Sequence, residues 1–362
     1  ADLVVVGPEA PLVAGAADAL AGAGIPVFGP TREGARIEGS KAFAKQVMAA
    51  AGVPTAGYWA GSDPSAAKAA LERFAPPYVV KADGLAAGKG VRICAGRAEA
   101  HAAIDAAMVE RVFGEAGATV VVEEFLDGPE VSLFGLCDGQ TVVALEPAQD
   151  FKRALDGDRG PNTGGMGAYS PVPAVAGDLL ERLQDSVLTP TLHELAKRGA
   201  RYVGVLYAGL VLSPDGPRVL EFNARFGDPE TQVVLPRLRS DLGDVLAACT
   251  SGQLAALGPL EWDPRACVTV VLASGGYPGR HRTGLPISGL EALDAVPDAL
   301  AFHAGTRRDG DRIVTAGGRV LSVSALGATV ADARARAYRA ADRISFGGLH
   351  RRDDIAATVT EA

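Results

Sequence analysis

A segment near residue 220 carries a carboxylate, an amide and a guanidinium in close succession. Glu221, Asn223 and Arg225 occupy every second position, so on a β-strand their side chains point to one face. Carboxylate and amide oxygens suit Mg²⁺, which shares its other ligands with substrate phosphates. An arginine one step along could neutralise a phosphoryl group during its transfer. A solvated strand face is the alternative, but the polar run Glu-x-Asn-x-Arg-x-Gly-Asp-Pro-Glu favours a site.

A glycine-rich loop follows a short apolar run and reads Lys81-Ala82-Asp83-Gly84-Leu85-Ala86-Ala87-Gly88-Lys89-Gly90. A P-loop would read G-x-x-x-x-G-K-[ST] and continue into a helix. Here Gly84 and Gly88 are one residue too close, and Gly90 replaces the hydroxyl residue. We therefore predict a flap between two antiparallel strands, which closes over a triphosphate with its backbone N–H groups. Lys81 would reach phosphate oxygens, and a hairpin tip with solvated lysines is the alternative.

Two further segments could contact small ligands. In residues 120–130 an apolar strand ends in the paired carboxylates Glu123 and Glu124. The backbone there could lie beside an adenine and Glu130 could hold ribose hydroxyls, although a strand ending in a polar turn looks the same. Residues 160–171 contain four glycines and two prolines, which favours a rigid loop that contacts a ligand over a plain surface linker.

Strands and helices must position these segments. The chain opens on a strand–helix–strand unit over residues 3–6, 12–23 and 25–28, which is typical of a parallel α/β sheet. Ser40 and Gly52 predict the start and end of a helix over Lys41–Ala51. We expect a βαβ-like stretch over 58–125 and a long loop over 150–171. Further strands are expected at 78–81, 91–94, 119–123, 131–136, 142–145, 204–212, 218–222, 268–273 and 319–325, and helices at 98–113, 177–198 and 329–343.

The bulk composition excludes several classes of protein. The 362 residues suffice for two to three domains of ~150 residues. A net charge of −8 argues against nucleic acid as a partner, because phosphate binding calls for a basic surplus. Four scattered cysteines without a C-x-x-C pair argue against a structural zinc or a disulfide framework and favour a reducing cytoplasm. The longest apolar stretch, Val203–Leu212, falls short of the ~20 residues of a membrane span.

Together these residues resemble those of ATP-grasp enzymes and, within that superfamily, of the phosphoribosylamine–glycine ligase (glycinamide ribonucleotide synthetase) family. The 160–171 and 221–232 strings are specific to this ligase family. The matching segments run along nearly the whole chain: Val6–Leu12, Phe28–Thr31, Glu38–Phe43, Lys81–Val91, Glu123–Gly128, Gly160–Pro171, Leu206–Leu210, Glu221–Gln232, Gly275–Gly279 and Phe302–Thr306.

The resemblance implies a mixed α/β and α+β multidomain fold. An ATP-grasp fold of two α+β subdomains would follow a partial Rossmann-like N-terminal domain and precede a small mixed α/β C-terminal domain. The expected boundaries are 1–38 for the N-terminal remnant, 39–58 with 127–262 for the metal-carrying central subdomain, 59–126 for the flap subdomain, and 263–362 for the C-terminal domain.

The resemblance also implies a reaction of de novo purine synthesis. Glycine would attack the γ-phosphoryl group of ATP to form glycyl phosphate, and the amine of 5-phosphoribosylamine would displace phosphate to give glycinamide ribonucleotide. The cofactors would be ATP and Mg²⁺ (or Mn²⁺). The protein would be a cytoplasmic monomer that acts on small molecules, without nucleic acid or membrane as a partner.

Matching motif positions assign roles to individual residues. Arg225 and Lys81 would be catalytic, and Glu221 and Asn223 would ligate the metal. The ATP site would comprise Lys41, Lys81, Gly84, Gly88, Lys89, Gly90, Glu123, Glu124, Phe125, Leu126 and Glu130. Glycine and phosphoribosylamine would contact Asp150, Asn162, Thr163, Gly164, Gly165, Arg225 and Asp228.

The chain departs from the family pattern at its start. Family members begin with a strand and a G-x-G-G-R-E-H-A loop thought to help bind the sugar phosphate, and nothing like it occurs here. Either the sequence is partial or the chain is a natural or engineered truncation. If it is genuinely short, we expect the ATP site to survive, the phosphoribosylamine site to be impaired and a sheet edge to be exposed. The rival interpretations are another ATP-grasp carboxylate–amine ligase, which would lack the 160–171 string, an ATP-binding but inactive module, and a structural protein with glycine loops.

Overall fold

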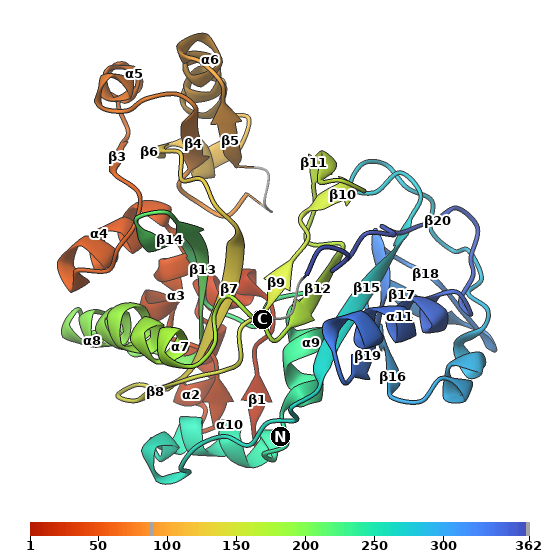
Figure 1. Ribbon diagram of the computed structural model, residues 1–362. Helices are drawn as coiled ribbons and strands as arrows, with labels where there is room; N and C mark the ends of the chain where they lie inside the picture. The colour runs from red at the N-terminus through yellow and green to blue at the C-terminus, as the bar shows by residue number, and fades with distance from the viewer. Residues whose placement is uncertain (87–89, 360–362) are drawn as a thin grey trace. The chain divides into compact units, whose positions relative to one another are not determined.

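The computed structural model describes residues 1–86 and 90–359, so Gly88 and Lys89 of the flap lie outside the described residues. The chain divides into two compact units (Figure 1). Unit 1 comprises Ala1–Leu145, Asp178–Phe226 and Leu242–Gly258, and unit 2 comprises Glu146–Gly177, Gly227–Asp241 and Pro259–Ala362.

Unit 1 opens with β1 (Val4–Val5) and β2 (Val27–Phe28), which pair in parallel as the strand–helix–strand pattern predicts. The single helix expected over 12–23 is wrong. The structure has α1 (Glu9–Ala14) and α2 (Ala16–Gly22), separated by Gly15 at φ +90°. That left-handed conformation suits glycine and ends the first helix.

The flap subdomain is an antiparallel sheet in the order β3-β6-β4-β5. Its helices α5 and α6 cover one sheet face (Figure 1). The expected βαβ-like pairing is wrong, because β6 inserts antiparallel between β3 and β4. The predicted antiparallel strands on either side of the flap are confirmed, with Lys81 opposite Val91. The elements are β3 (Tyr58–Gly61), α5 (Pro64–Ala70), β4 (Tyr78–Ala82), β5 (Val91–Cys94), α6 (Arg97–Met108) and β6 (Val120–Glu124).

Strand alternation gives this sheet two different faces. Tyr78, Val80 and Val122 point into the core beneath α5 and α6. Lys81 and Glu123, one position along on the same strands, therefore point to the opposite face.

The central part of unit 1 is an antiparallel sheet in the order β14-β13-β7-β8. Helix α4 begins and ends at the predicted residues, capped by Ser40 and Gly52. The uninterrupted helix expected over 177–198 is wrong, because a π-helical turn, Gln184–Leu188, separates α7 from α8. The elements are α3 (Arg32–Gly39), α4 (Lys41–Ala51), β7 (Glu130–Asp138), β8 (Val142–Ala144), α7 (Asp178–Leu183), α8 (Thr189–Lys197), β13 (Val203–Ser213), β14 (Gly216–Asn223) and α10 (Leu242–Ser251).

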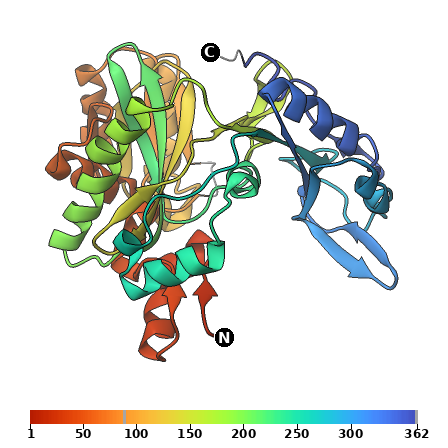
Figure 2. The same ribbon diagram turned by 60° about the horizontal axis from the view of Figure 1, so that its bottom comes forward.

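Unit 2 is built on a sheet in the order β16-β19-β15-β12-β9, with β20 also paired to β15. Helix α11 packs along β15 and β19 (Figure 2). The long loop expected over 150–171 is wrong in part, because this segment contains the β10–β11 hairpin and the buried strand β12. The elements are β9 (Gln149–Asp150), β10 (Arg153–Leu155), β11 (Arg159–Asn162), β12 (Gly167–Ser170), α9 (Thr231–Val234), β15 (Ala266–Ser274), β16 (Ala299–His303), β17 (Thr306–Asp309), β18 (Arg312–Thr315), β19 (Arg319–Gly327), α11 (Val330–Ala341) and β20 (Leu349–His350).

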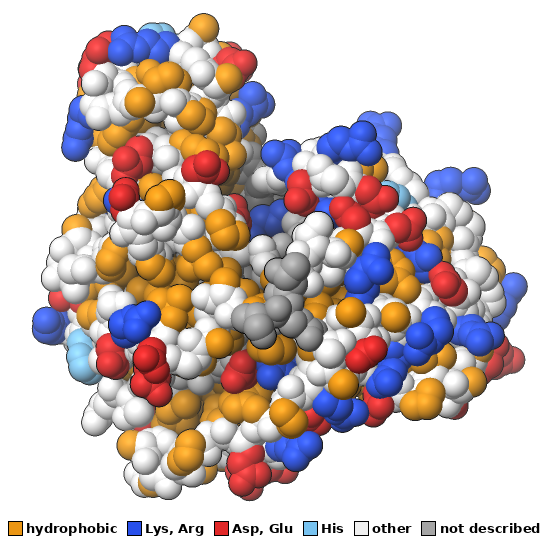
Figure 3. All heavy atoms as spheres, viewed as in Figure 1, with side chains coloured by type: hydrophobic (Ala, Val, Ile, Leu, Met, Phe, Trp, Pro, Cys, Tyr) orange, Lys and Arg blue, Asp and Glu red, His pale blue; other side chains and the backbone are white. Residues whose placement is uncertain are grey.

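The hydropathy of the helices and the distribution of surface charge bear on possible partners. Across residues 1–86 and 90–359, no helix is both long enough and apolar enough to span a bilayer. On the face drawn in Figure 3, acidic and basic side chains are interspersed.

Candidate active site

The strand expected to hold a metal is β14, and a β-bulge interrupts the regular alternation of its side chains. Glu221 pairs with Gly209 and Val219 pairs with Leu210, which leaves Leu220 as the extra residue. The bulge explains why Val219 and Phe222 are both buried although three positions apart. Beyond it the strand is regular, so Glu221 and Asn223 lie on one face.

The oxygens of Glu221 and Asn223 are available to a ligand. Within the described part of the chain, neither side chain makes a hydrogen bond or an ion pair, and both residues are partly exposed. No group of three or more His, Cys, Asp or Glu side chains gathers as a metal cage among those residues. Two protein oxygens fit Mg²⁺, which usually keeps phosphate and water ligands. Burial lowers the pKa of Lys41, and the Glu221 carboxylate partly offsets that shift.

The expectation that Arg225 shares a strand face with Glu221 and Asn223 is wrong, because β14 ends at Asn223. Arg225 lies just beyond the strand and is held by two carboxylates from the start of the chain. Its Nε lies 3.1 Å from Glu9 Oε2, and an Nη lies 3.2 Å from Glu38 Oε1. Glu38 also accepts a 2.8 Å hydrogen bond from the backbone N–H of Ala224. Burial raises the pKa of Glu38, and the charge of Arg225 opposes the shift. The guanidinium is thus oriented while remaining one-quarter exposed.

Lys41 is fixed by a contact between helix α4 and the start of the flap. Asp83 Oδ1 accepts hydrogen bonds from the Ala42 N–H at 2.6 Å and from Ser40 Oγ at 3.1 Å. The Lys41 N–H donates to the Asp83 carbonyl at 3.1 Å. A carboxylate at a helix N-terminus is electrostatically favourable. Asp83 therefore ties the first helical turn, which carries Lys41, to the flap.

Lys81 and Glu123 meet on the inner face of the flap sheet. Lys81 Nζ lies 3.0 Å from Glu123 Oε2 and 3.2 Å from the carbonyl oxygen of Leu220, the bulge residue. Lys45 of α4 approaches the same carboxylate, with Nζ 3.2 Å from Glu123 Oε1. All three charged residues are buried. Sequence reasoning missed Lys45, because its burial on α4 carries no motif.

The segment expected to contact adenine and ribose continues from β6. Glu124 Oε1 accepts a hydrogen bond from the Gly57 N–H at 2.7 Å and pairs with Arg218 at 3.2 Å. Phe125 is exposed, Leu126 is half-buried and Glu130 is exposed. These side chains are therefore less enclosed than the Glu123 carboxylate.

The described glycines of the flap loop have little room for a side chain. A Cβ on Gly84 would lie 2.8 Å from Ala116 Cβ, and one on Gly90 would lie 2.8 Å from Ala86 Cβ. Such separations are too short for ordinary contact, so glycine is required at both positions.

In unit 2, Arg319 joins the glycine loop to Asp228. Its Nη1 donates to the Gly164 carbonyl at 2.7 Å and to the Asp228 carbonyl at 2.6 Å, and its Nη2 lies 3.0 Å from Asp228 Oδ2. Tyr277 Oη accepts from the Gly164 N–H at 3.1 Å. Gly165 at φ +109° lies against Pro229, where a Cβ would approach to 2.4 Å. Sequence reasoning missed Arg319 and Tyr277, which lie far along the chain.

Three other residues of unit 2 that were predicted to contact substrate, Asp150, Asn162 and Thr163, lie on or beside β9 and β11. Asp150 Oδ1 pairs with Lys152 Nζ at 2.7 Å. Thr163 Oγ1 donates to the Lys152 carbonyl at 2.9 Å and accepts from the Gly165 N–H at 3.0 Å. Asn162 is exposed at the end of β11 and pairs with Arg153. Asp150 and the Thr163 turn are therefore linked through Lys152.

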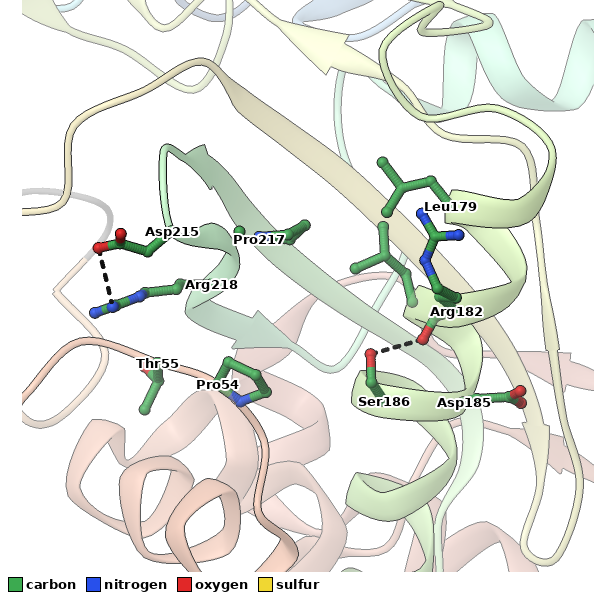
Figure 4. Close-up of a pocket in the computed structure, with 11 residues that line it drawn as sticks. Pro54, Thr55, Leu179, Arg182, Asp185, Ser186, Asp215, Pro217 and Arg218 are labelled. Carbon is green, nitrogen blue, oxygen red and sulfur yellow. Dashed lines mark hydrogen bonds and ion pairs between the residues drawn. The ribbon is translucent and has the colours of Figure 1, made fainter.

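A pocket of about 810 Å³ lies elsewhere in unit 1. The tip of the β13–β14 hairpin, helix α7, the π-helical turn and the segment before β3 surround it (Figure 4). None of the described predicted site residues lines it. Its lining residues are Pro54, Thr55, Leu179, Arg182, Leu183, Asp185, Ser186, Asp215, Gly216, Pro217 and Arg218.

Family models of phosphoribosylglycinamide synthetase match the chain in three successive blocks. The N domain matches residues 1–38, the ATP-grasp (A) domain residues 39–231 and the C domain residues 267–358. The chain belongs to the phosphoribosylglycinamide synthetase family. The fold class and family expected from the sequence are therefore confirmed.

Relatives in this family match along nearly the whole chain. The phosphoribosylamine–glycine ligase of Streptomyces coelicolor is 58% identical over 100% of this chain and 85% of its own length. That of Leifsonia xyli is 53% identical over 98% of this chain and 84% of its own length. The crystal structure of the Thermotoga maritima ligase superposes with a TM-score of 0.81 at 37% identity, covering 91% of this chain and 82% of that one.

A more distant structure shares the fold alone. The biotin carboxylase domain of the Hydrogenobacter thermophilus 2-oxoglutarate carboxylase, in complex with ADP, its magnesium salt and bicarbonate, has a TM-score of 0.76 at 17% identity. The match covers 97% of this chain and 76% of that one. The ATP-grasp family implies ATP and a divalent cation as the reagents of such a fold.

Proposed function

We propose that the chain joins glycine to 5-phosphoribosylamine at the expense of ATP, giving glycinamide ribonucleotide, ADP and phosphate in purine synthesis. Membership of the family makes the protein a ligase that forms a C–N bond. The observation that carries the site assignment is the face of β14, where Glu221 and Asn223 stand open beside the ion-paired Arg225.

The ATP site is assigned to unit 1. Lys41 and Lys81 bind phosphate oxygens, and the flap glycines allow backbone N–H groups to approach them. The backbone at Glu124, Phe125 and Leu126 contacts adenine, and Glu130 binds the ribose.

Glu123 receives a different role from its neighbours. Its side chain faces two lysines, and its backbone is paired on both sides by Tyr58 and Val79. We therefore assign the Glu123 side chain to pairing with Lys45 and Lys81, in place of base recognition.

Phosphoryl transfer is assigned to the end of β14. Glu221 and Asn223 hold Mg²⁺ or Mn²⁺, which when bound withdraws charge from the phosphates. A glycine carboxylate oxygen attacks the γ-phosphorus and ADP leaves. Arg225 stabilises the resulting acyl phosphate. The amine of phosphoribosylamine then attacks the glycyl carbonyl carbon, and inorganic phosphate leaves.

Binding of glycine and phosphoribosylamine is assigned to residues of unit 2. Asp150 and Asp228 are the anionic groups, and the 162–165 turn presents backbone groups. Arg319 supports this assignment because it holds Gly164 and Asp228 at hydrogen-bonding distance. We retain the domain boundaries 1–38, 39–58 with 127–262, 59–126 and 263–362, and propose a cytoplasmic monomer.

The test is ADP release by the purified protein with ATP, Mg²⁺, glycine and freshly generated phosphoribosylamine, each omitted in turn. The proposal expects release that requires all four components. ADP release that depends on a different carboxylate would favour another ATP-grasp ligase. ATP binding without turnover under any of these mixtures would favour an inactive module.

A further inference from the structure

The buried cluster of Lys45, Glu123 and Lys81, here called the Lys–Glu–Lys cluster, holds two ammonium groups on one carboxylate. Glu123 has 2% of its side chain exposed, Lys45 2% and Lys81 7%. Burying charge away from water is unfavourable unless it is compensated. The second ammonium group therefore calls for an explanation.

The two lysines are anchored differently. Lys45 Nζ donates to Thr55 Oγ1 at 2.7 Å, and that hydroxyl donates onward to the Val219 carbonyl at 2.6 Å. Lys45 thus belongs to a fixed chain of contacts between α4 and β14. Among the described residues, Lys81 Nζ contacts only Glu123 Oε2 and the carbonyl oxygen of Leu220.

The Glu123 carboxylate is likewise divided between its partners. Oε1 accepts no hydrogen bond from the described residues, so Lys45 compensates it by charge at 3.2 Å. Oε2 faces Lys81 at 3.0 Å. If Lys81 turns to a phosphate, as the proposed function requires, Lys45 is the cation that remains on the carboxylate.

We propose that Lys45 is a positioning residue that keeps Glu123 compensated while Lys81 binds a phosphate of ATP. The inference rests on the proposed phosphate-binding role of Lys81. Without Lys45, Lys81 would be the only cation among residues 1–86 and 90–359 within ion-pair distance of Glu123. Its departure would leave that buried carboxylate without an ion-pair partner among them. Lys81 would then stay on Glu123, and ATP would bind more weakly.

The cation needed for this role is present at neutral pH. Burial lowers the pKa of Lys45 to about 8, and the charge of Glu123 opposes the shift. Its ammonium group is therefore mainly protonated at pH ~7.

The test is a double-mutant cycle on the dissociation constant of MgATP, measured by calorimetry with the full chain. Lys45→Met is expected to weaken MgATP binding roughly tenfold, the effect typical of losing a supporting contact at a site. Combining it with Glu123→Gln, which removes the charge to be compensated, is expected to restore most of the affinity. If Lys45→Met weakens MgATP binding as much in the Glu123→Gln background as in the wild-type protein, the proposal is overturned.

Glu123→Gln alone provides a second test that leaves Lys45 in place. The proposal expects tighter MgATP binding, because Lys81 no longer has a carboxylate competing for it. Weaker binding in this variant would contradict the proposal even if Lys45→Met failed to fold. Lys68→Met is the matched control, since Lys68 pairs with Asp105 in the same unit at a partly exposed position, and it should leave the affinity unchanged.

Lys81→Met separates this inference from the proposed function. If Lys81→Met leaves MgATP affinity unchanged, the phosphate role of Lys81 fails and the inference fails with it. If Lys81→Met weakens binding while Lys45→Met does not, the phosphate role stands and the positioning role of Lys45 is wrong.

Discussion

Glu123 and Glu221 are acidic residues of the same unit, yet they differ in both burial and ion pairing. Glu123 is 2% exposed and lies between the ammonium groups of Lys45 and Lys81. Glu221 is partly exposed on β14 and makes no hydrogen bond or ion pair with residues 1–86 and 90–359. One carboxylate has its counter-charges within the fold, and the other is left open.

Desolvation explains the difference. A buried carboxylate must be paired when the chain folds, because its unpaired charge would destabilise the native state. A partly exposed carboxylate is solvated by water, so it can remain unpaired until a cation binds together with the substrate. Changes at Glu221 should therefore act on the chemical step, whereas changes around Glu123 should act on nucleotide affinity.

The largest effect is expected at Arg225. Its guanidinium is ion-paired like Glu123, by Glu9 and Glu38, and is partly exposed like Glu221. Arg225→Met is expected to lower kcat by about 10³-fold, the scale of arginine stabilisation in phosphoryl transfer. MgATP affinity should change little. Single-turnover ADP formation measures the chemical step, with Arg97→Met at an exposed ion pair as the matched control. A full-rate Arg225→Met enzyme would remove this residue from the mechanism.

Glu221→Gln tests the open carboxylate directly. The change keeps the shape of the side chain and removes its charge, so folding should be preserved. We expect kcat to fall by about 10²-fold, comparable to losing one group that stabilises transition-state charge. The Mg²⁺ concentration giving half-maximal rate should rise, as a titration of ADP release would measure. An unchanged Mg²⁺ dependence would contradict the metal role of Glu221.

The smallest expected effect is a pH dependence of MgATP binding. The pKa of Lys45 is lowered to about 8, so its charge is present below that pH and lost above it. The charged or titratable groups facing it are Glu123, Glu124, Lys81 and Tyr58. Affinity should fall by up to about tenfold between about pH 7 and about pH 9.

Lys45→Arg is the matched variant for the pH measurement, since a guanidinium stays charged throughout this range. Its affinity for MgATP should be nearly independent of pH. If wild-type and Lys45→Arg proteins show the same slope, titration of Lys45 does not cause the pH dependence.

Local signals were sufficient where a feature depends on neighbours in sequence. Ser40 and Gly52 set both ends of α4, because caps act on the adjacent helical turn. The alternation of Glu221 and Asn223 placed both on one strand face. The same reasoning failed at Gly15, where one left-handed residue divides an apparently continuous helix.

Contacts between distant segments could not be predicted from the sequence. Lys45 on Glu123, Glu38 on Arg225 and Arg319 on Asp228 each join residues with no shared motif. The β10–β11 hairpin was missed because its strands are short and rich in polar residues, so they lack the alternating apolar pattern of a half-buried strand. The motif residues can be recognised in the sequence. The side chains that support them are brought into contact by tertiary packing, which the sequence pattern does not show.

The most direct test of the central claim follows an oxygen atom from glycine into phosphate. With glycine labelled by oxygen-18 in its carboxylate, the inorganic phosphate released during turnover is examined by mass spectrometry. If the glycine carboxylate attacks ATP, each turnover should transfer one labelled oxygen to phosphate, and the remaining label should stay in the amide product. Unlabelled phosphate formed alongside glycinamide ribonucleotide would contradict the glycyl phosphate route and the roles assigned to Glu221 and Arg225.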